Sequence, residues 1–170
     1  MTNARALHRA YVEGDLEKVR ALLGNPADFP NCRGPTGLGE VVLEYAIYHA
    51  PVDSIRQLLE LGADANYDDH AGFPSLIAAL TCGRRDRLEM LTLLLDAGAD
   101  IGQRGFNGYT PLHQAVVLGD LEAAELLLSR GADPEARTDV DDFATPLQEA
   151  ENLGLEETAA RFRRLLSSAA

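Results

Sequence analysis

One pattern of apolar and polar positions recurs along the chain about every 35 residues. In its clearest copy, residues 107–138, Thr110 and Pro111 predict a helix start, because a threonine hydroxyl caps free N–H groups and proline fits the first helical position. Gly119 ends this helix and Gly131 ends a second one. Between these glycines, apolar residues at helical spacing predict a buried face: Leu121, Ala124, Leu127 and Leu128. We therefore expect a helix–turn–helix unit.

The same features occur five times, which predicts a repeat protein. An anchoring leucine recurs at intervals of 36, 33, 36 and 35 residues, at Leu7, Leu43, Leu76, Leu112 and Leu147. An alanine follows each leucine three residues later, and a helix-ending residue follows that alanine by four. Because alanine is small, it lets two helices approach closely. The pattern leaves no room for a linker or a second domain.

The segment T-P-L-H-Q-A at residues 110–115, together with the period, resembles an ankyrin repeat. The resemblance implies an all-α solenoid of five helix-turn-helix repeats joined by β-hairpin-like turns, in which each repeat buries its apolar faces against its neighbours. We expect a single domain over 1–170, with polar first and last repeats as caps. The expected repeats are approximately 4–30, 37–68, 70–104, 106–138 and 143–168.

Three places along the chain depart from the pattern. Val41 and Val42 replace the Thr-Pro start in the second repeat, which removes a capping hydroxyl at a cost of about 1 kcal/mol. In the third repeat, three extra residues are expected between the two helices, in a segment that contains Arg84, Arg85 and Arg87. The turn after the first repeat is also long, by about three residues.

Composition and charge limit the class of partner. The 15 basic and 27 acidic residues give a net charge of −12, so nucleic acid is not expected as a partner. No apolar run reaches the roughly 20 residues that cross a bilayer, and no signal-peptide core is present, so we expect a cytoplasmic protein without a membrane partner. The charge and the polar caps favour a monomer. Cys32 and Cys82 form no C-x-x-C pair and are interpreted as reduced thiols.

No catalytic constellation is found, so we predict that the protein is not an enzyme and needs no metal or other cofactor. His8 and His113 occupy the histidine position of the L-H-x-A motif, where the resemblance implies a structural imidazole that bonds the backbone of an adjacent repeat. No serine lies in a nucleophile-elbow sequence. The aspartates at 139–142 lack the glycine and terminal glutamate of a calcium loop.

The resemblance implies a protein partner on the concave side, contacted by the hairpin tips and by the ends of the first helices. The candidate residues at these positions are Tyr48, His49, Asp68, His70, Phe73, Arg104, Phe106, Asn107, Tyr109, Val117 and Leu118. Aromatic residues are enriched at the energetic centres of interfaces, although these rings could instead pack on neighbouring hairpins. Acidic tips favour a partner with a basic patch.

The main hypothesis for the function is a binding module. The alternative is a regulatory or inhibitory subunit whose extended turn or arginine insertion covers the active site of an enzyme.

Overall fold

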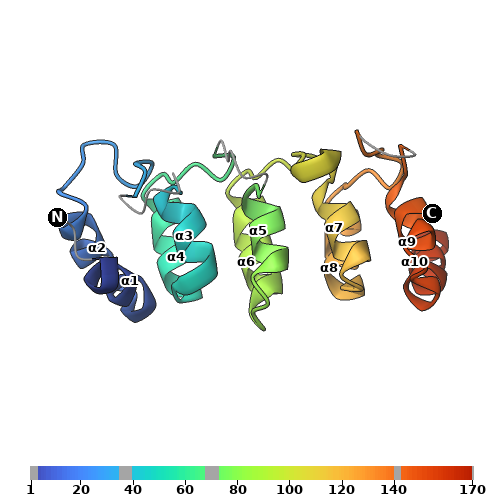
Figure 1. Cartoon of the computed structure of the whole chain (residues 1–170), viewed down its shortest axis with the longest axis horizontal. Helices are drawn as coiled ribbons and strands as arrows, with labels where there is room; N and C mark the ends of the chain where they lie inside the picture. Colours follow the sequence, from blue (N-terminus) through green and yellow to red (C-terminus); the bar gives the residue numbers. More distant parts are fainter. Residues whose placement is uncertain (1–3, 35–39, 68–72, 140–142, 170) are drawn as a thin grey trace.

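The computed structural model describes residues 4–34, 40–67, 73–139 and 143–169. Within these ranges the chain forms α-helices and one short 3-10 helix, and no strand longer than the isolated bridge between Arg33 and Val41. The α-helices form five antiparallel pairs (Figure 1): α1 (Ala4–Glu13) and α2 (Leu16–Leu22), α3 (Val42–His49) and α4 (Val52–Glu60), α5 (Ser75–Thr81) and α6 (Arg87–Asp96), α7 (Pro111–Val117) and α8 (Leu121–Ser129), α9 (Pro146–Asn152) and α10 (Glu156–Ala169). The 3-10 helix η1 (Phe106–Gly108) precedes α7.

The five pairs stand side by side in one row, with the two chain ends at opposite ends of the row (Figure 1). The connections from one pair to the next follow one long edge, which we call the hairpin edge. The short turns within each pair follow the other long edge, which we call the turn edge. The all-α solenoid predicted from the repeat pattern is confirmed.

Capping explains where the first helices of the fourth and fifth repeats begin. Thr110 accepts the backbone N–H of His113, and Thr145 accepts that of Gln148 at 3.3 Å, so α7 and α9 start directly after a capping threonine. Val41 has the same extended backbone but makes no side-chain cap for α3, as its sequence predicts. Gly119 ends the α7 unit with a φ of +70°, a conformation that costs glycine little.

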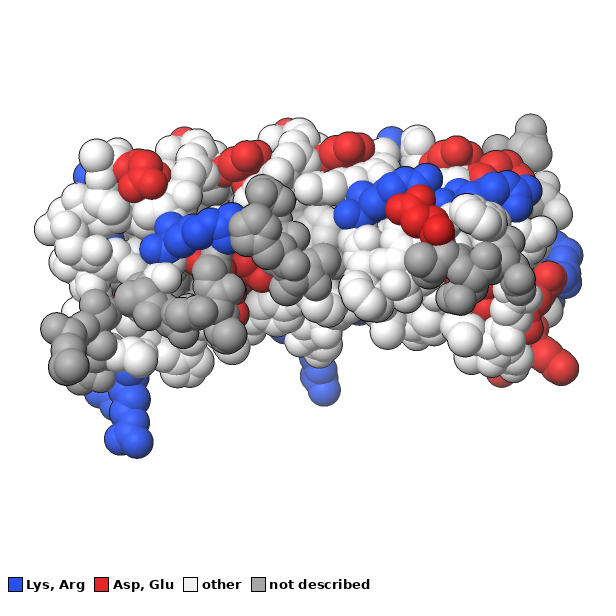
Figure 2. All heavy atoms as spheres, turned by 45° about the horizontal axis from the view of Figure 1, so that its top comes forward, with Lys and Arg blue, Asp and Glu red and all other residues white. Residues whose placement is uncertain are grey.

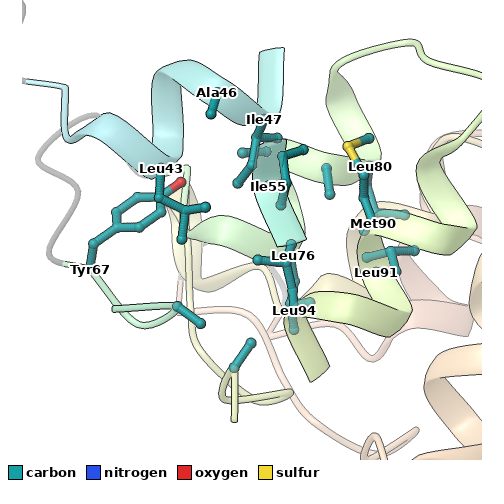
Figure 3. Packing of buried hydrophobic residues seen from close by; sticks show 14 of the residues in the cluster. Leu43, Ala46, Ile47, Ile55, Tyr67, Leu76, Leu80, Met90, Leu91 and Leu94 are labelled. Atoms are coloured by element: carbon teal, nitrogen blue, oxygen red, sulfur yellow. The ribbon is translucent and has the colours of Figure 1, made fainter. Parts of the chain in front are cut away.

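The core is built from the recurring leucines and alanines. Figure 3 shows apolar side chains of α3–α6 pointing into the space between the helices, where Leu76 and Leu94 lie next to each other. The alanine three residues after each anchoring leucine is 0% exposed in every repeat: Ala10, Ala46, Ala79, Ala115 and Ala150. Any larger side chain at these positions would force the stacked helices apart.

Asparagines join the first three repeats at the hairpin edge. Asn31 donates from Nδ2 to Gly62 O at 2.9 Å and accepts the N–H of Asp64 at 2.7 Å. Asn66 makes the same two bonds to Gly98 and Asp100, at 2.9 and 2.6 Å. The long turn after the first repeat is thus tied to the second repeat at Asn31.

The arginine insertion differs in part from the prediction. The turn between α5 and α6 is residues 82–86, five residues against three in the turn 118–120 between α7 and α8. Arg87 does not lie in this turn, because it is the first residue of α6, which has ten residues against nine in α8. One of the three extra residues therefore lengthens the helix, where Arg87 pairs with the next repeat.

Candidate functional site

Four of the predicted partner-binding residues line one cavity at the hairpin edge. This hairpin pocket has a volume of about 230 Å³ and is formed between two successive repeats. Its lining residues are Phe73, Ile77, Phe106, Asn107, Tyr109 and Gln114. Ile77 comes from α5 and Gln114 from α7, while the other four precede these helices. Side chains separated by more than thirty residues in the sequence therefore share one site.

The local backbone holds Phe106 at the surface. Asn107 and Gly108 have φ values of +58° and +75°, which turn the chain sharply after Phe106. A Cβ on Gly108 would lie 2.5 Å from Asp139 N, so only glycine fits against the next hairpin here. The Phe106 side chain is left 71% exposed, and Phe73 is 38% exposed. The pocket thus has an accessible apolar rim.

Tyr109 forms a fixed wall of the pocket. Its hydroxyl donates to the carboxylate of Glu149 in the next repeat, and its ring centroid lies 5.5 Å from that of His113. The ring is half-buried. Tyr109 therefore contributes an apolar surface to the pocket and at the same time joins the fourth and fifth repeats.

Arg104 joins two hairpins. Its Nη1 donates to Gly108 O and Asp139 Oδ1, both at 3.1 Å, and to Arg137 O at 2.5 Å. The guanidinium is therefore occupied by its own repeat and by the next one. The charge of Arg104, a predicted binding residue, is therefore already used inside the protein.

Tyr48 and His49 lie in a second group, away from the hairpin pocket. The group, which we call the α1–α3 aromatic cluster, consists of His8, Tyr11, Tyr45, Tyr48 and His49. The His49 ring centroid lies 4.4 Å from that of Tyr45 and 5.1 Å from that of His8. The pKa of His49 is lowered, mainly because burial among these rings removes water from the imidazole and to a smaller extent because His8 is close by. His8 bonds the Tyr45 hydroxyl at 3.0 Å, a side chain rather than the backbone expected from its motif position.

Val117 and Leu118 belong to neither group. Val117 is half-buried at the end of α7, and Leu118 follows it at the turn edge with 50% exposure. Asp68 and His70 lie outside the described residues. The eleven predicted positions therefore do not form one continuous site.

His113 has the structural role that its motif position implies. The side chain is 0% exposed, and its Nε2 lies 3.0 Å from Ala144 O in the next repeat. Nδ1 accepts the N–H of Thr110 at 3.3 Å, so Nε2 carries the proton and donates to Ala144 O. Burial lowers the pKa of His113, which keeps the ring neutral.

Ile77 and Gln114 were missed as lining residues. Ile77 directly follows the anchoring Leu76, and Gln114 lies two residues after Leu112, so both are on the first helix of a repeat. The family resemblance implies binding residues only at hairpin tips and at the ends of the first helices. The sequence signal for Ile77 and Gln114 is their position in the helical turn that follows an anchoring leucine.

A family comparison covers the first four repeats of the array. The family model "Ankyrin repeats (3 copies)" matches residues 7–105 and 43–138, which together cover more than half of the chain. The chain belongs to the ankyrin repeat family. Ankyrin repeats are generally protein-interaction modules and are typically non-catalytic.

Relatives of this ankyrin repeat chain come from animals and bacteria. It is 30% identical to the tyrosine-protein kinase Shark of Drosophila melanogaster over 92% of its own length but spans only 16% of that kinase. It is 30% identical over 77% of its length to a putative ankyrin repeat protein of Rickettsia felis, of which it spans 42%. The putative ankyrin repeat protein YahD of Escherichia coli is 27% identical, with 86% of this chain and 89% of the relative covered.

The described ankyrin repeats hold no grouping of side chains for metal binding and no membrane-spanning helix. Within residues 4–34, 40–67, 73–139 and 143–169, no group of three or more His, Cys, Asp or Glu side chains could hold a metal ion. In the same part of the chain, no helix is both long and apolar enough to cross a membrane. Burial raises the pKa of the Cys32 and Cys82 thiols, which lowers the fraction of reactive thiolate at neutral pH.

Proposed function

We propose that this ankyrin array binds a folded protein partner, and that the hairpin pocket receives an apolar side chain of that partner. The observation that carries the proposal is the placement of Phe106, 71% exposed, beside Phe73 at the rim of a cavity of about 230 Å³. That volume suits one large side chain. Burying such a side chain contributes about 1.5–3 kcal/mol, and anchors of this kind dominate the binding energy of protein interfaces.

The rigidity of the pocket also favours binding. Tyr109 is held by Glu149, and Arg104 joins the hairpin that carries Phe106 to the next one, so this side of the pocket is fixed before a partner arrives. A pre-formed site loses less side-chain entropy on association. We therefore expect the free and bound forms of the hairpins to be closely similar.

The charge of the surface bears on which partner is favoured. Figure 2 shows acidic groups recurring along the whole length of the face that includes the hairpin edge, with basic groups between them. The net charge is −12. A partner with a basic patch beside its apolar anchor would associate faster, an effect on the rate of encounter more than on the final affinity.

The test is affinity capture from a lysate of the source organism with quantitative mass spectrometry. Wild type is compared with a Phe73→Ala, Phe106→Ala double variant, in which Tyr109 is kept because it stabilises the fold. Phe143→Ala is the matched control, since Phe143 is another hairpin aromatic, 59% exposed, that does not line the pocket. Thermal denaturation of each variant verifies that the array remains folded.

The proposal predicts a protein that wild type and Phe143→Ala retain equally and that the double variant loses. Equal retention by all three would refute the pocket as the binding site. Absence of any specifically retained protein would refute the binding function itself. Once a partner is captured, its activity is measured with and without this chain, because loss of activity distinguishes an inhibitory subunit from a scaffold.

A further inference from the structure

A large cavity lies at the turn edge, on the opposite side of the array from the hairpin pocket. It has a volume of about 590 Å³ and is formed by the turns 82–86 and 118–120, by the helix ends next to these turns and by α10; the carboxylates of Asp120 and Glu122 also line it. Four of the fifteen basic residues of the chain line it: Arg84, Arg85, Arg87 and Arg161. We call it the arginine cavity. So many arginines in one place are unexpected in a protein with a net charge of −12.

Two of these arginines hold the walls in place. Arg84 binds the Asp86 carboxylate with two bonds of 2.9 and 2.6 Å and also donates to Ala50 O in the preceding repeat. Arg87 binds Asp120, with one bond of 2.8 Å, and lies 3.3 Å from Glu122. The Asp120 side chain is only 10% exposed, so this pair is shielded from water. The turn is thereby fixed in both directions along the array.

The other two arginines are not neutralised. Among the described residues, neither Arg85 nor Arg161 makes an ion pair or a hydrogen bond through its side chain, and both are exposed. Arg85 comes from the lengthened turn and Arg161 from α10, so they approach the cavity from different elements. A guanidinium offers a planar set of donors that matches a carboxylate. Two such groups at one cavity favour an anionic ligand.

The cavity also has apolar surface. Leu80 and Leu118 line it, and the Leu118 side chain is 50% exposed. A neighbouring shallow hollow of about 500 Å³ shares Leu121, Glu122 and Arg161 with it and continues along α10 past Leu165, where Glu125 and Arg164 also line it. The surface around the arginine cavity therefore offers both charged and apolar contacts. A small inorganic anion would leave its apolar part uncovered.

We propose that the arginine cavity binds an acidic peptide segment of a partner protein, with carboxylates on Arg85 and Arg161 and an apolar side chain on Leu118. A nucleic acid fits less well, because the −12 net charge repels its phosphate backbone and that backbone carries no apolar side chain that could cover Leu118. At physiological ionic strength, salt screens charges that lie more than about 8 Å from an acidic side chain. The nearby arginines therefore dominate the electrostatic interaction at the site. This surface is separate from the hairpin pocket and does not depend on the function proposed for it.

The test uses a fluorescein-labelled peptide of three Glu-Glu-Leu-Leu blocks and measures its binding by fluorescence anisotropy. In an extended peptide, alternate residues share a side, so each side of this sequence presents both a carboxylate and a leucine. Arg85→Gln and Arg161→Gln are compared with wild type. Arg9→Gln is the matched control, because Arg9 is exposed on α1 at the far end of the array and carries the same charge. A peptide with Gln in place of Glu tests the need for carboxylates.

The proposal predicts that Arg85→Gln and Arg161→Gln each weaken binding about tenfold, whereas Arg9→Gln and Phe106→Ala change it less than about twofold. It also predicts that the Gln peptide binds at least tenfold more weakly. No binding of the Glu peptide to wild type, or equal binding by all the arginine variants, would overturn the proposal. Displacement of the peptide by a single-stranded oligonucleotide that depends on Arg85 and Arg161 in the same way would assign the cavity to nucleic acid instead.

Discussion

The fourth and fifth repeats are joined by a buried imidazole, and replacing His113 by alanine tests how much that joint stabilises the array. His113 donates to Ala144 O at 3.0 Å and accepts the N–H of Thr110 at 3.3 Å. Alanine removes one of the two donors to Ala144 O, which keeps the Thr138 N–H at 3.1 Å, so the lost hydrogen bond costs about 0.5–1.5 kcal/mol. The missing ring leaves a cavity as well, and truncation of a buried ring to alanine costs about 3–5 kcal/mol. We expect a loss of about 3–5 kcal/mol.

The assay is urea denaturation at neutral pH, followed by circular dichroism, with Gln148→Ala as the matched control. Gln148 occupies the same motif position in the last repeat and accepts the N–H of Thr145 at 3.0 Å. It is exposed, and among the described residues its side chain makes no hydrogen bond to another repeat, so its loss should cost about 1 kcal/mol or less. Equal losses for the two variants would refute the conclusion that His113 joins the repeats.

The same imidazole should make stability depend on pH. Burial lowers the pKa of His113, so the folded state favours the neutral ring. The resulting stabilisation is fully present above the unfolded pKa of about 6.5 and is lost as the pH falls toward the lower folded pKa. His113→Gln, which can keep the cap of α7 as Gln148 does for α9, should lose less stability than wild type over that range. Identical pH profiles for the two proteins would contradict this.

Three further predictions concern the core, a cap and an ion pair. Leu112→Ala should lower the free energy of unfolding by about 2–5 kcal/mol, because Leu112 is 0% exposed, and an unchanged urea midpoint would contradict the repeat register. Val41→Thr should stabilise the protein by up to about 1 kcal/mol, because a threonine hydroxyl at this position can cap α3. Val41 has φ −77° and ψ 160°, close to the −83° and 165° of the capping Thr110. A lower melting temperature of the variant would contradict this prediction. The hydrogen bonds from Arg87 lower the pKa of Asp120, so stabilisation by this carboxylate is present above about pH 4 and is lost as the pH falls through the lower folded pKa. The stability of Asp120→Asn should therefore approach that of wild type in acid. A stability difference that is independent of pH would refute this.

The candidate site could be predicted from the sequence only in part. Phe73, Phe106, Asn107 and Tyr109 were found because a hairpin position can be assigned from its distance to the helix start. That they share a pocket depends on how closely two repeats stack, which no local pattern encodes. The same limit explains why Ile77 was missed, since its neighbours across the pocket lie in another repeat.

Pairing of charges was the least predictable feature. From the sequence, Arg104 was a candidate contact for a partner, but its guanidinium is used by Arg137 O and Asp139, more than thirty residues away. A long flexible side chain can reach several partners, and the choice depends on small differences in the position of adjacent turns. Sequence position alone cannot distinguish an arginine that supports the fold from one that is available for binding.

The sequence by itself determined the repeating helix pairs, because the signals for them are local. Caps such as Thr110, the anchoring leucines and the glycines after each helix act within a few residues of their own position. Only the tertiary structure decided which side chains are available at the hairpin pocket and at the arginine cavity. It left Phe106 exposed at the hairpin edge, and it neutralised Arg84 while leaving Arg85 without a partner at the turn edge. Both outcomes depend on contacts between successive repeats, and those contacts exist only once the repeats have stacked.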